Sequence, residues 1–215
     1  MTTTVIQNIQ ETARETVIQS DDIEKDIRQL VIQALKEGEL DSDAIKQTLH
    51  SVLEGASEGS NSQFDENTEA LEQVVTGMDA ALGQVAEASK LAIEEASGNL
   101  QDFSDHDLKR ALNDLQDLES LFLNTLSEVA HKGKDTTEET LVGLLEHLQN
   151  SGSSVGESVT KIVTDLHHDL SKNGRLEKIQ AADIAKAAGI SFARISSGIF
   201  AGIADTLADK GDGKK

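Results

Sequence analysis

The feature of this sequence that most constrains its fold is an apolar spacing that alternates between four and three residues and continues unbroken over 68–96. The positions on this seam are Thr68, Leu71, Val75, Met78, Leu82, Val85, Ser89, Ala92 and Ala96. Residues at this spacing share one side of an α-helix, whereas a strand would need a period of two. The seam therefore predicts a long helix that packs lengthwise against other helices, as in a coiled coil.

The rest of the chain shows a similar helical spacing, and the sequence contains no proline. Nothing therefore demands a kinked helix, and no alternating run indicates a strand. We predict an all-α protein. The expected helices run over about 4–19, 22–37, 41–56, 68–96, 104–132, 135–172 and 175–209, the sixth with a weak point at 150–154.

The predicted organisation is a small module followed by a bundle. A stretch rich in Gly, Ser and Asn within 51–62 is the predicted linker. Residues 1–60 are expected to form a small N-terminal helical hairpin with a lead-in helix. The long helices that follow predict an elongated up-down four-helix bundle over 61–210. Residues 211–215 are the expected flexible tail.

Composition excludes several classes of function. The chain has no cysteine, which excludes disulfides, thiolate zinc sites and cysteine nucleophiles. Its net charge of −20 repels nucleic acid over most of the surface, so we expect no nucleic-acid partner. The N-terminal residues lack the basic and apolar regions of a secretory signal, which makes the cytoplasm the expected location.

Two fragments are similar to the Glu-x-x-His motif of di-metal helical bundles. One is Glu128-x-x-His131, and the other is the altered form Asp165-x-x-His168. A di-metal site needs such residues to project into the bundle interior. Here the neighbouring seam residues Val129, Ile162 and Leu166 turn the histidines toward the flank or a helix end. We therefore predict no metal site, no cofactor and no catalytic residue.

Four further patterns depart from known motifs. Residues 133–136 lack the first glycine of a phosphate-binding loop, and Asp135 stands where that loop has its hydroxyl. Ser158-x-x-Lys161 has no Lys-Thr-Gly partner. Residues 41–52 lack the glycine and the closing glutamate of a calcium loop. The hairpin 22–57 carries eight acidic and four basic residues, which is the wrong sign for DNA.

The last helix-length segment, 181–207, differs from everything before it. Residues 173–215 carry seven basic and five acidic residues, whereas residues 1–172 carry twelve and thirty-four. Between Ala187 and Ala204 the one charged residue is Arg194. Placed on a helix, the segment has a broad apolar face that forms the candidate interaction site. The residues of this apolar face are Ile184, Phe192, Ile195, Ile199, Phe200, Ile203 and Leu207.

Several segments resemble known proteins. Residues 27–41 (IRQLVIQALKEGELD) and 103–126 (FSDHDLKRALNDLQDLESLFLNTL), with the final GIFAGIADTL, are similar to an uncharacterised family of bacterial helical proteins. This resemblance implies a bacterial origin and a helical fold, and no particular function. In composition, residues 62–131 also resemble phasins, which coat intracellular polyester granules.

These observations favour a non-enzymatic structural or interaction protein that acts through apolar helix faces and self-associates. The expected partner is a second copy or another protein. The first alternative is a phasin-like amphipathic coat on a membrane, lipid or polymer surface. The second is a di-metal carboxylate bundle enzyme. For the apolar face of 181–207 itself, the leading expectation is burial as the fourth helix of the bundle, ahead of a subunit interface and of contact with a lipid or polymer surface.

Overall fold

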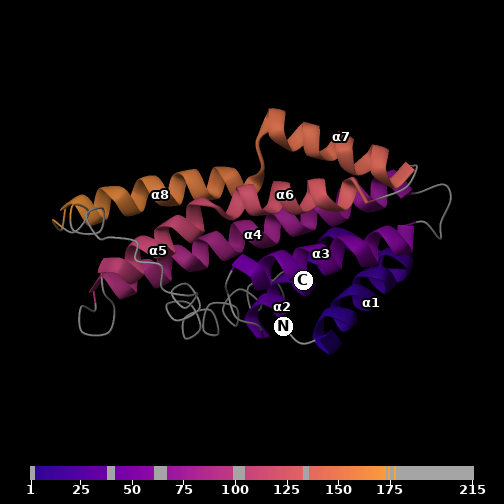
Figure 1. Ribbon diagram of the computed structural model, residues 1–215, viewed down its shortest axis with the longest axis horizontal. Helices are drawn as coiled ribbons and strands as arrows, with labels where there is room; N and C mark the ends of the chain where they lie inside the picture. Colours follow the sequence, from indigo (N-terminus) through magenta and orange to yellow (C-terminus); the bar gives the residue numbers. More distant parts are fainter. Residues whose placement is uncertain are drawn as a thin grey trace, which may run out of the picture.

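The protein is all-α, as the sequence predicts (Figure 1). The computed structural model describes residues 3–37, 42–60, 67–98, 105–132, 136–172, 174 and 177. The helices of this part are α1 (Thr3–Gln19), α2 (Ile23–Glu37), α3 (Ser42–Ser60), α4 (Asn67–Gly98), α5 (Asp105–Gln116), α6 (Leu118–Ala130), α7 (Thr136–Ser151) and α8 (Ser154–Lys172).

Helix α4 forms the axis of the molecule. Its 32 residues span about 48 Å at 1.5 Å per residue. It packs against α2 and α8 most extensively and also contacts α3, α5 and α7. The seam residues from Leu71 to Ala92 are all buried, which confirms the long helix that the spacing predicts.

Helices α1 and α3 form the closest pair in the N-terminal part, because glycines of α3 lie directly on the backbone of α1. A Cβ atom at Gly55 would collide with the Gln10 carbonyl, and one at Gly59 would meet the Arg14 carbonyl at 2.7 Å. The linker predicted within 51–62 was therefore wrong as far as Ser60, whereas the helix predicted over 41–56 is confirmed and continues to Ser60. These small residues belong to α3, where they permit close packing.

A similar close approach joins α2 to α4. A Cβ atom at Gly77 of α4 would collide with the Glu24 carbonyl of α2. Ile27 and Val31 of α2 are fully buried in the apolar core at this interface. The missing side chain of Gly77 therefore sets the distance between these two helices.

The predicted single helix 104–132 is divided at Asp117. The backbone there has φ −83° and ψ −6°, and the hydrogen bonds from Asp117 N to Asn113 O and from Leu121 N to Asp117 O continue on both sides. The two halves have different neighbours, since α5 packs mainly on α4 and α8 whereas α6 packs mainly on α3 and α7. These different neighbours account for the division of the predicted helix into α5 and α6.

The predicted single helix 135–172 is also divided, at the weak point. Gly152 has φ +86°, a conformation that glycine adopts readily and other residues rarely do. Helix α7 then lies on α6 and α4, whereas α8 runs mainly along α4 (Figure 1). The heptad register continues across residue 152, but the helix does not.

The described helices share one continuous apolar core. It contains buried residues from both sides of residue 60, such as Leu49 and Leu53 of α3 and Met78 and Leu82 of α4. The division into units 1–60, 61–210 and 211–215 stays a prediction. The expected helix 175–209, which would be the fourth of the bundle, lies outside the described residues.

Candidate functional site

The most organised polar site is the start of α8, where all the first backbone donors have partners. Asp79 of α4 accepts hydrogen bonds from Ser154 N at 2.7 Å and from Val155 N at 2.9 Å. Ser153 Oγ accepts one from Gly156 N at 3.0 Å, and Glu157 N donates to the Ser153 carbonyl. Helix starts leave these N–H groups without partners inside the helix. Asp79 and Ser153 therefore cap α8 together.

A second carboxylate completes this site. Ser153 Oγ donates a hydrogen bond of 2.7 Å to Glu119 Oε1 of α6. A Cβ atom at Gly156 would collide with the Glu119 carboxylate, so the glycine makes room for it. The first turn of α8 is thus tied to α4 through Asp79 and to α6 through Glu119.

Asp79 is a buried acid, with 6% of its surface exposed. Burial raises the pKa of its carboxyl, and the nearby charge of Glu119 raises it further. The hydrogen bonds from Val155 and Ser154 act in the opposite direction. Both carboxylate oxygens face backbone N–H groups, so in this arrangement Asp79 holds the end of a helix in place.

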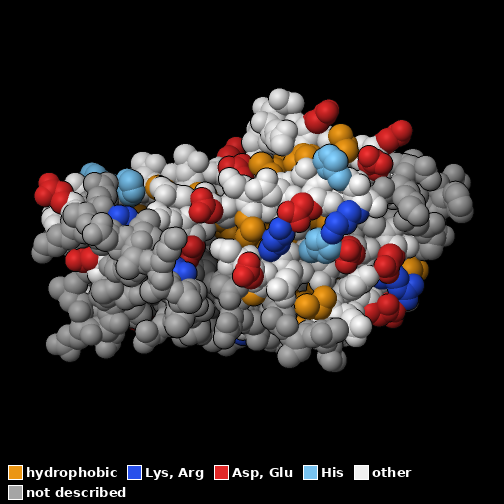
Figure 2. Space-filling view, in the orientation of Figure 1, with side chains coloured by type: hydrophobic (Ala, Val, Ile, Leu, Met, Phe, Trp, Pro, Cys, Tyr) orange, Lys and Arg blue, Asp and Glu red, His pale blue; other side chains and the backbone are white. Residues whose placement is uncertain are grey.

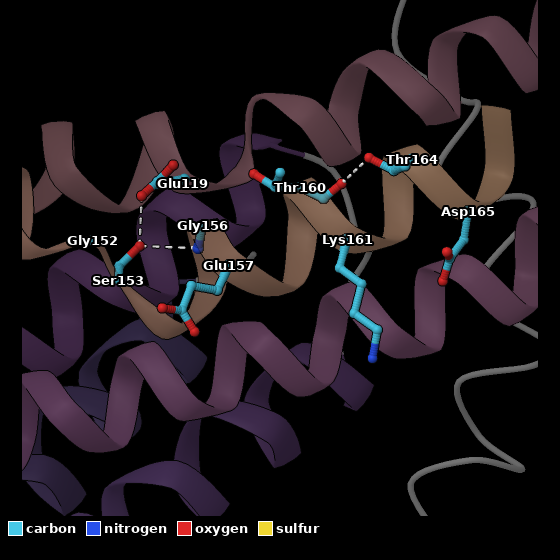
Figure 3. Close-up of a pocket in the computed structure, with 9 residues that line it drawn as sticks. All are labelled: Glu119, Gly152, Ser153, Gly156, Glu157, Thr160, Lys161, Thr164 and Asp165. Atoms are coloured by element: carbon cyan, nitrogen blue, oxygen red, sulfur yellow. Dashed lines mark hydrogen bonds between the residues drawn. The ribbon is translucent and has the colours of Figure 1, made fainter. Parts of the chain in front are cut away.

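An open groove of about 560 Å³ runs along α8 beside this cap (Figure 3). Its lining residues are Glu119, Gly152, Ser153, Gly156, Glu157, Thr160, Lys161, Thr164 and Asp165. Figure 3 shows Glu119 and Ser153 on one side of α8, while Glu157, Lys161 and Asp165 extend along the other. The groove has no histidine or cysteine among its described lining residues. Its charged residues are the carboxylates Glu119, Glu157 and Asp165 and the cation Lys161.

The Asp165 end of the groove is anchored to α4. Lys90 Nζ donates a hydrogen bond of 2.9 Å to Asp165 Oδ2. This bond lowers the pKa of Asp165 and raises that of Lys90. Both side chains are half-buried at the surface, where an ion pair adds little stability, so its role is to orient α8 against α4.

A second polar cluster lies on the surface where α3 meets α6 (Figure 2). Lys46 Nζ binds Glu128 Oε1 at 2.6 Å, and this hydrogen bond lowers the pKa of Glu128. Lys132 Nζ lies 3.1 Å from His50 Nε2, which accepts a hydrogen bond from the lysine in the tautomer that carries its hydrogen on Nδ1. The other ring nitrogen of His50 lies 3.4 Å from Glu54 Oε2. These contacts join the two helices across the surface.

The carboxylates of the two Glu-x-x-His-like fragments bind lysines on different helices. Glu128 binds Lys46 of α3, whereas Asp165 binds Lys90 of α4. His131 and His168 are exposed, as the seam predicts, and the Nδ1 atom of His131 lies 2.7 Å from the Ser127 carbonyl. Among the described residues, no group of three or more His, Cys, Asp or Glu side chains could hold a metal ion.

The predicted apolar face lies outside the described residues, with all seven of its members: Ile184, Phe192, Ile195, Ile199, Phe200, Ile203 and Leu207. Residues 133–135 of the loop-like pattern and Asp41 also lie outside them. Ser158 and Lys161 both lie on α8, and Lys161 lines the groove.

Sequence reasoning missed the cap of α8, although two signals for it were present. Asp79 is the one charged residue in the mainly apolar stretch from Val74 to Val85. Gly152 followed by Ser153 is typical of a helix end followed by a helix start. Neither signal identifies the hydrogen-bond partner in the other helix, because Asp79 and Ser154 are 75 positions apart in the sequence.

The fold and these sites define an all-helical protein whose polar clusters join helices to one another. The chain belongs to a family of unknown function (DUF6781), whose model matches residues 2–209. The resemblance to an uncharacterised family is therefore confirmed, whereas the likeness to phasins stays a prediction. No curated protein and no solved structure matches the chain. In the described part, no helix has the length and apolar character needed to cross a membrane.

Proposed function

We propose that this protein is a non-catalytic interaction protein that associates with a second copy of itself through the apolar face of its C-terminal segment. The observation that carries the proposal is the contrast within the sequence. Residues 1–172 have a net charge of −22, whereas residues 173–215 have a net charge of +2. The C-terminal segment has one charged residue between Ala187 and Ala204 and seven large apolar residues on one face of the predicted helix. An apolar face of this size is stabilised when it is buried against a partner.

The polar sites of the described helices support a non-catalytic role. General acid–base chemistry needs a side chain that is free to exchange a proton with a substrate. Both oxygens of Asp79 accept backbone hydrogen bonds, and Glu128 and Asp165 bind lysines on neighbouring helices. The carboxylates with shifted pKa values at these positions therefore join helices.

The test of self-association is the mass of the full chain in solution, measured by light scattering over a range of concentrations. We expect a mass of two chains of 23.0 kDa each for the unsubstituted protein. Phe200→Asp places a charge on the apolar face and should give a mass of one chain. The control is Ser197→Asp, which adds the same charge on the polar side of the same segment and should leave the dimer intact. A mass of one chain for the unsubstituted protein at all concentrations would refute self-association.

A surface-coating role is the second candidate, favoured by the amphipathic character of the segment. A helix with a wide apolar face and a polar opposite face lies along a lipid or polymer surface. Arg194 near its middle would cost about 2.5–3.5 kcal/mol in a membrane span, which favours lying on the surface over crossing it. Flotation with liposomes tests this role. Binding that Phe200→Asp abolishes and Ser197→Asp preserves, together with a mass of one chain, would favour the coat.

A further inference from the structure

A second pocket, of about 300 Å³, lies at the break between α5 and α6, opposite the first turn of α3. Its floor is apolar, because Ile45, Leu115 and Leu118 are buried there and Leu121 is half-buried. The polar residues that complete its lining are Ser42, Asp114, Asp117, Ser120 and Asn124. The pocket therefore has room for an apolar side chain at its base and polar partners at its rim.

The rim of this pocket is acidic. Asp114 and Asp117 are its charged residues, and no basic residue is among the described residues that line it. Asp117 occupies the N-cap position of α6, yet its side chain makes no capping hydrogen bond and is exposed. The pocket is thus complementary to an apolar side chain that stands beside a cation.

We propose that this pocket binds the chain's own C-terminal segment through Ile190 and Arg194. These residues are four positions apart, so on the helix that the sequence predicts they share one side. Ile190 supplies the apolar group for the floor, and Arg194 supplies the cation for Asp117, whose side chain makes no capping hydrogen bond. Arg194 is also the one charged residue between Ala187 and Ala204.

The length of chain between α8 and Arg194 matches the distance to the pocket. Helix α8 has 19 residues and is about 28 Å long. Gly174 follows it with φ +64°, a conformation typical of a helix end. A helix that returns along α8 from there would advance about 30 Å by residue 194. It would then be level with the start of α8, where Ser153 binds Glu119 on the side of α6 that faces α8. The pocket lies at the same level, on the side of α6 that faces α3.

Docking through Ile190 and Arg194 has a consequence for the apolar face. Arg194 lies about 160° around the predicted helix from Phe192, at the centre of that face. Binding in the pocket would therefore turn Phe192, Ile199 and Ile203 away from the acidic body. This inference rests on the proposed function and deepens it, because it names the surface that presents the apolar face to a second copy.

Disulfide trapping tests the assignment, since the chain has no cysteine of its own. The test variant carries Ser120→Cys at the exposed rim of the pocket and Ser191→Cys, on the same side of the predicted helix as Arg194. The control variant carries Ser120→Cys and Ser196→Cys, on the opposite side. Under mild oxidation, the 120–191 pair should form an intramolecular disulfide faster than the 120–196 pair. Equal rates for the two pairs would overturn the proposal.

Charge reversal in the 120–191 background tests the role of the cation. Arg194→Glu should slow trapping about threefold to fivefold, the size expected from an exposed pair worth up to about 1 kcal/mol. Adding Asp117→Arg should restore part of the lost rate, because the charges are then exchanged. Lys186→Glu makes the same charge change away from the pocket and should have little effect. Equal slowing by Arg194→Glu and Lys186→Glu would overturn the assignment to Arg194.

Non-reducing electrophoresis shows whether one chain or two take part. A disulfide within one chain supports the proposal. A covalent dimer through the 120–191 pair would overturn it and assign the pocket to the segment of a second copy. The mass of the reduced variants, measured in parallel, reports on self-association separately. A mass of one chain with intramolecular trapping would refute the proposed function and leave this inference standing.

Discussion

Replacement of Asp79 by alanine should weaken the protein at one identifiable point, the start of α8. The substitution removes the acceptors of Ser154 N and Val155 N. Val155 is fully buried, and a buried donor without a partner costs about 1–3 kcal/mol. Ser154 is exposed, so water can replace its hydrogen bond, at a cost of about 1 kcal/mol or less.

The loss of a buried charge offsets part of this cost. Because burial raises the pKa of Asp79, the ionised carboxylate is held at an energetic penalty that alanine removes. We expect Asp79→Ala to lower the free energy of unfolding by about 2 kcal/mol. Asp79→Asn keeps one acceptor oxygen without the charge, so it should cost about half as much.

Urea unfolding followed by circular dichroism measures these differences, and amide hydrogen exchange locates them. The amides of Ser154 and Val155 should lose protection in Asp79→Ala more than that of Gly156, which donates to Ser153. Thr160→Ala, at an exposed position of the same helix, should change stability by less than about 0.5 kcal/mol. A loss in Asp79→Ala no larger than this control, or unchanged exchange at Val155, would refute the assignment of Asp79 as the cap.

Three further predictions concern pH and glycine. The folded state binds the Asp79 proton more tightly than the unfolded state does. The unfolding free energy of the wild type relative to Asp79→Asn should therefore rise as pH falls from above the raised pKa to about 3.9, and a flat difference would contradict this. Gly77→Ala should cost about 1–3 kcal/mol in urea unfolding, because it pushes α4 away from the Glu24 carbonyl. Gly83→Ala on the same helix, whose new Cβ atom would meet Ser158 at an ordinary 3.5 Å, should instead be neutral or stabilising by up to about 1 kcal/mol. Gly152→Ala should lower the melting temperature through a cost of about 1 kcal/mol, since φ is +86° there, and an unchanged temperature would argue against strain.

Helix type and the buried side of each helix could be predicted because both depend on neighbours three and four positions away. The α4 seam from Leu71 to Ala92 is buried as its spacing predicts. The exposure of His131 and His168 follows from the same periodicity. The glycines of α3 were misinterpreted as linker residues, because local composition is similar in a flexible segment and in a close helix contact.

The candidate site was only partly predictable. The Gly152–Ser153 pair indicates a helix boundary, but a register that continues from Leu148 to Val155 favours an uninterrupted helix. The boundary exists because Asp79 and Glu119, from two other helices, bind the first turn of α8. No periodicity within α7 and α8 contains that information.

The sequence by itself determined an all-α protein, the length of α4, the apolar side of each helix, and the absence of cysteine chemistry. These properties follow from composition and from contacts within one or two helical turns. The tertiary structure alone decided where the long apolar repeats break, which helices lie side by side, and how α8 begins. The physical reason is that an N–H group at a helix start can donate to any suitable oxygen nearby, and only the fold brings the carboxylate of Asp79 to that place.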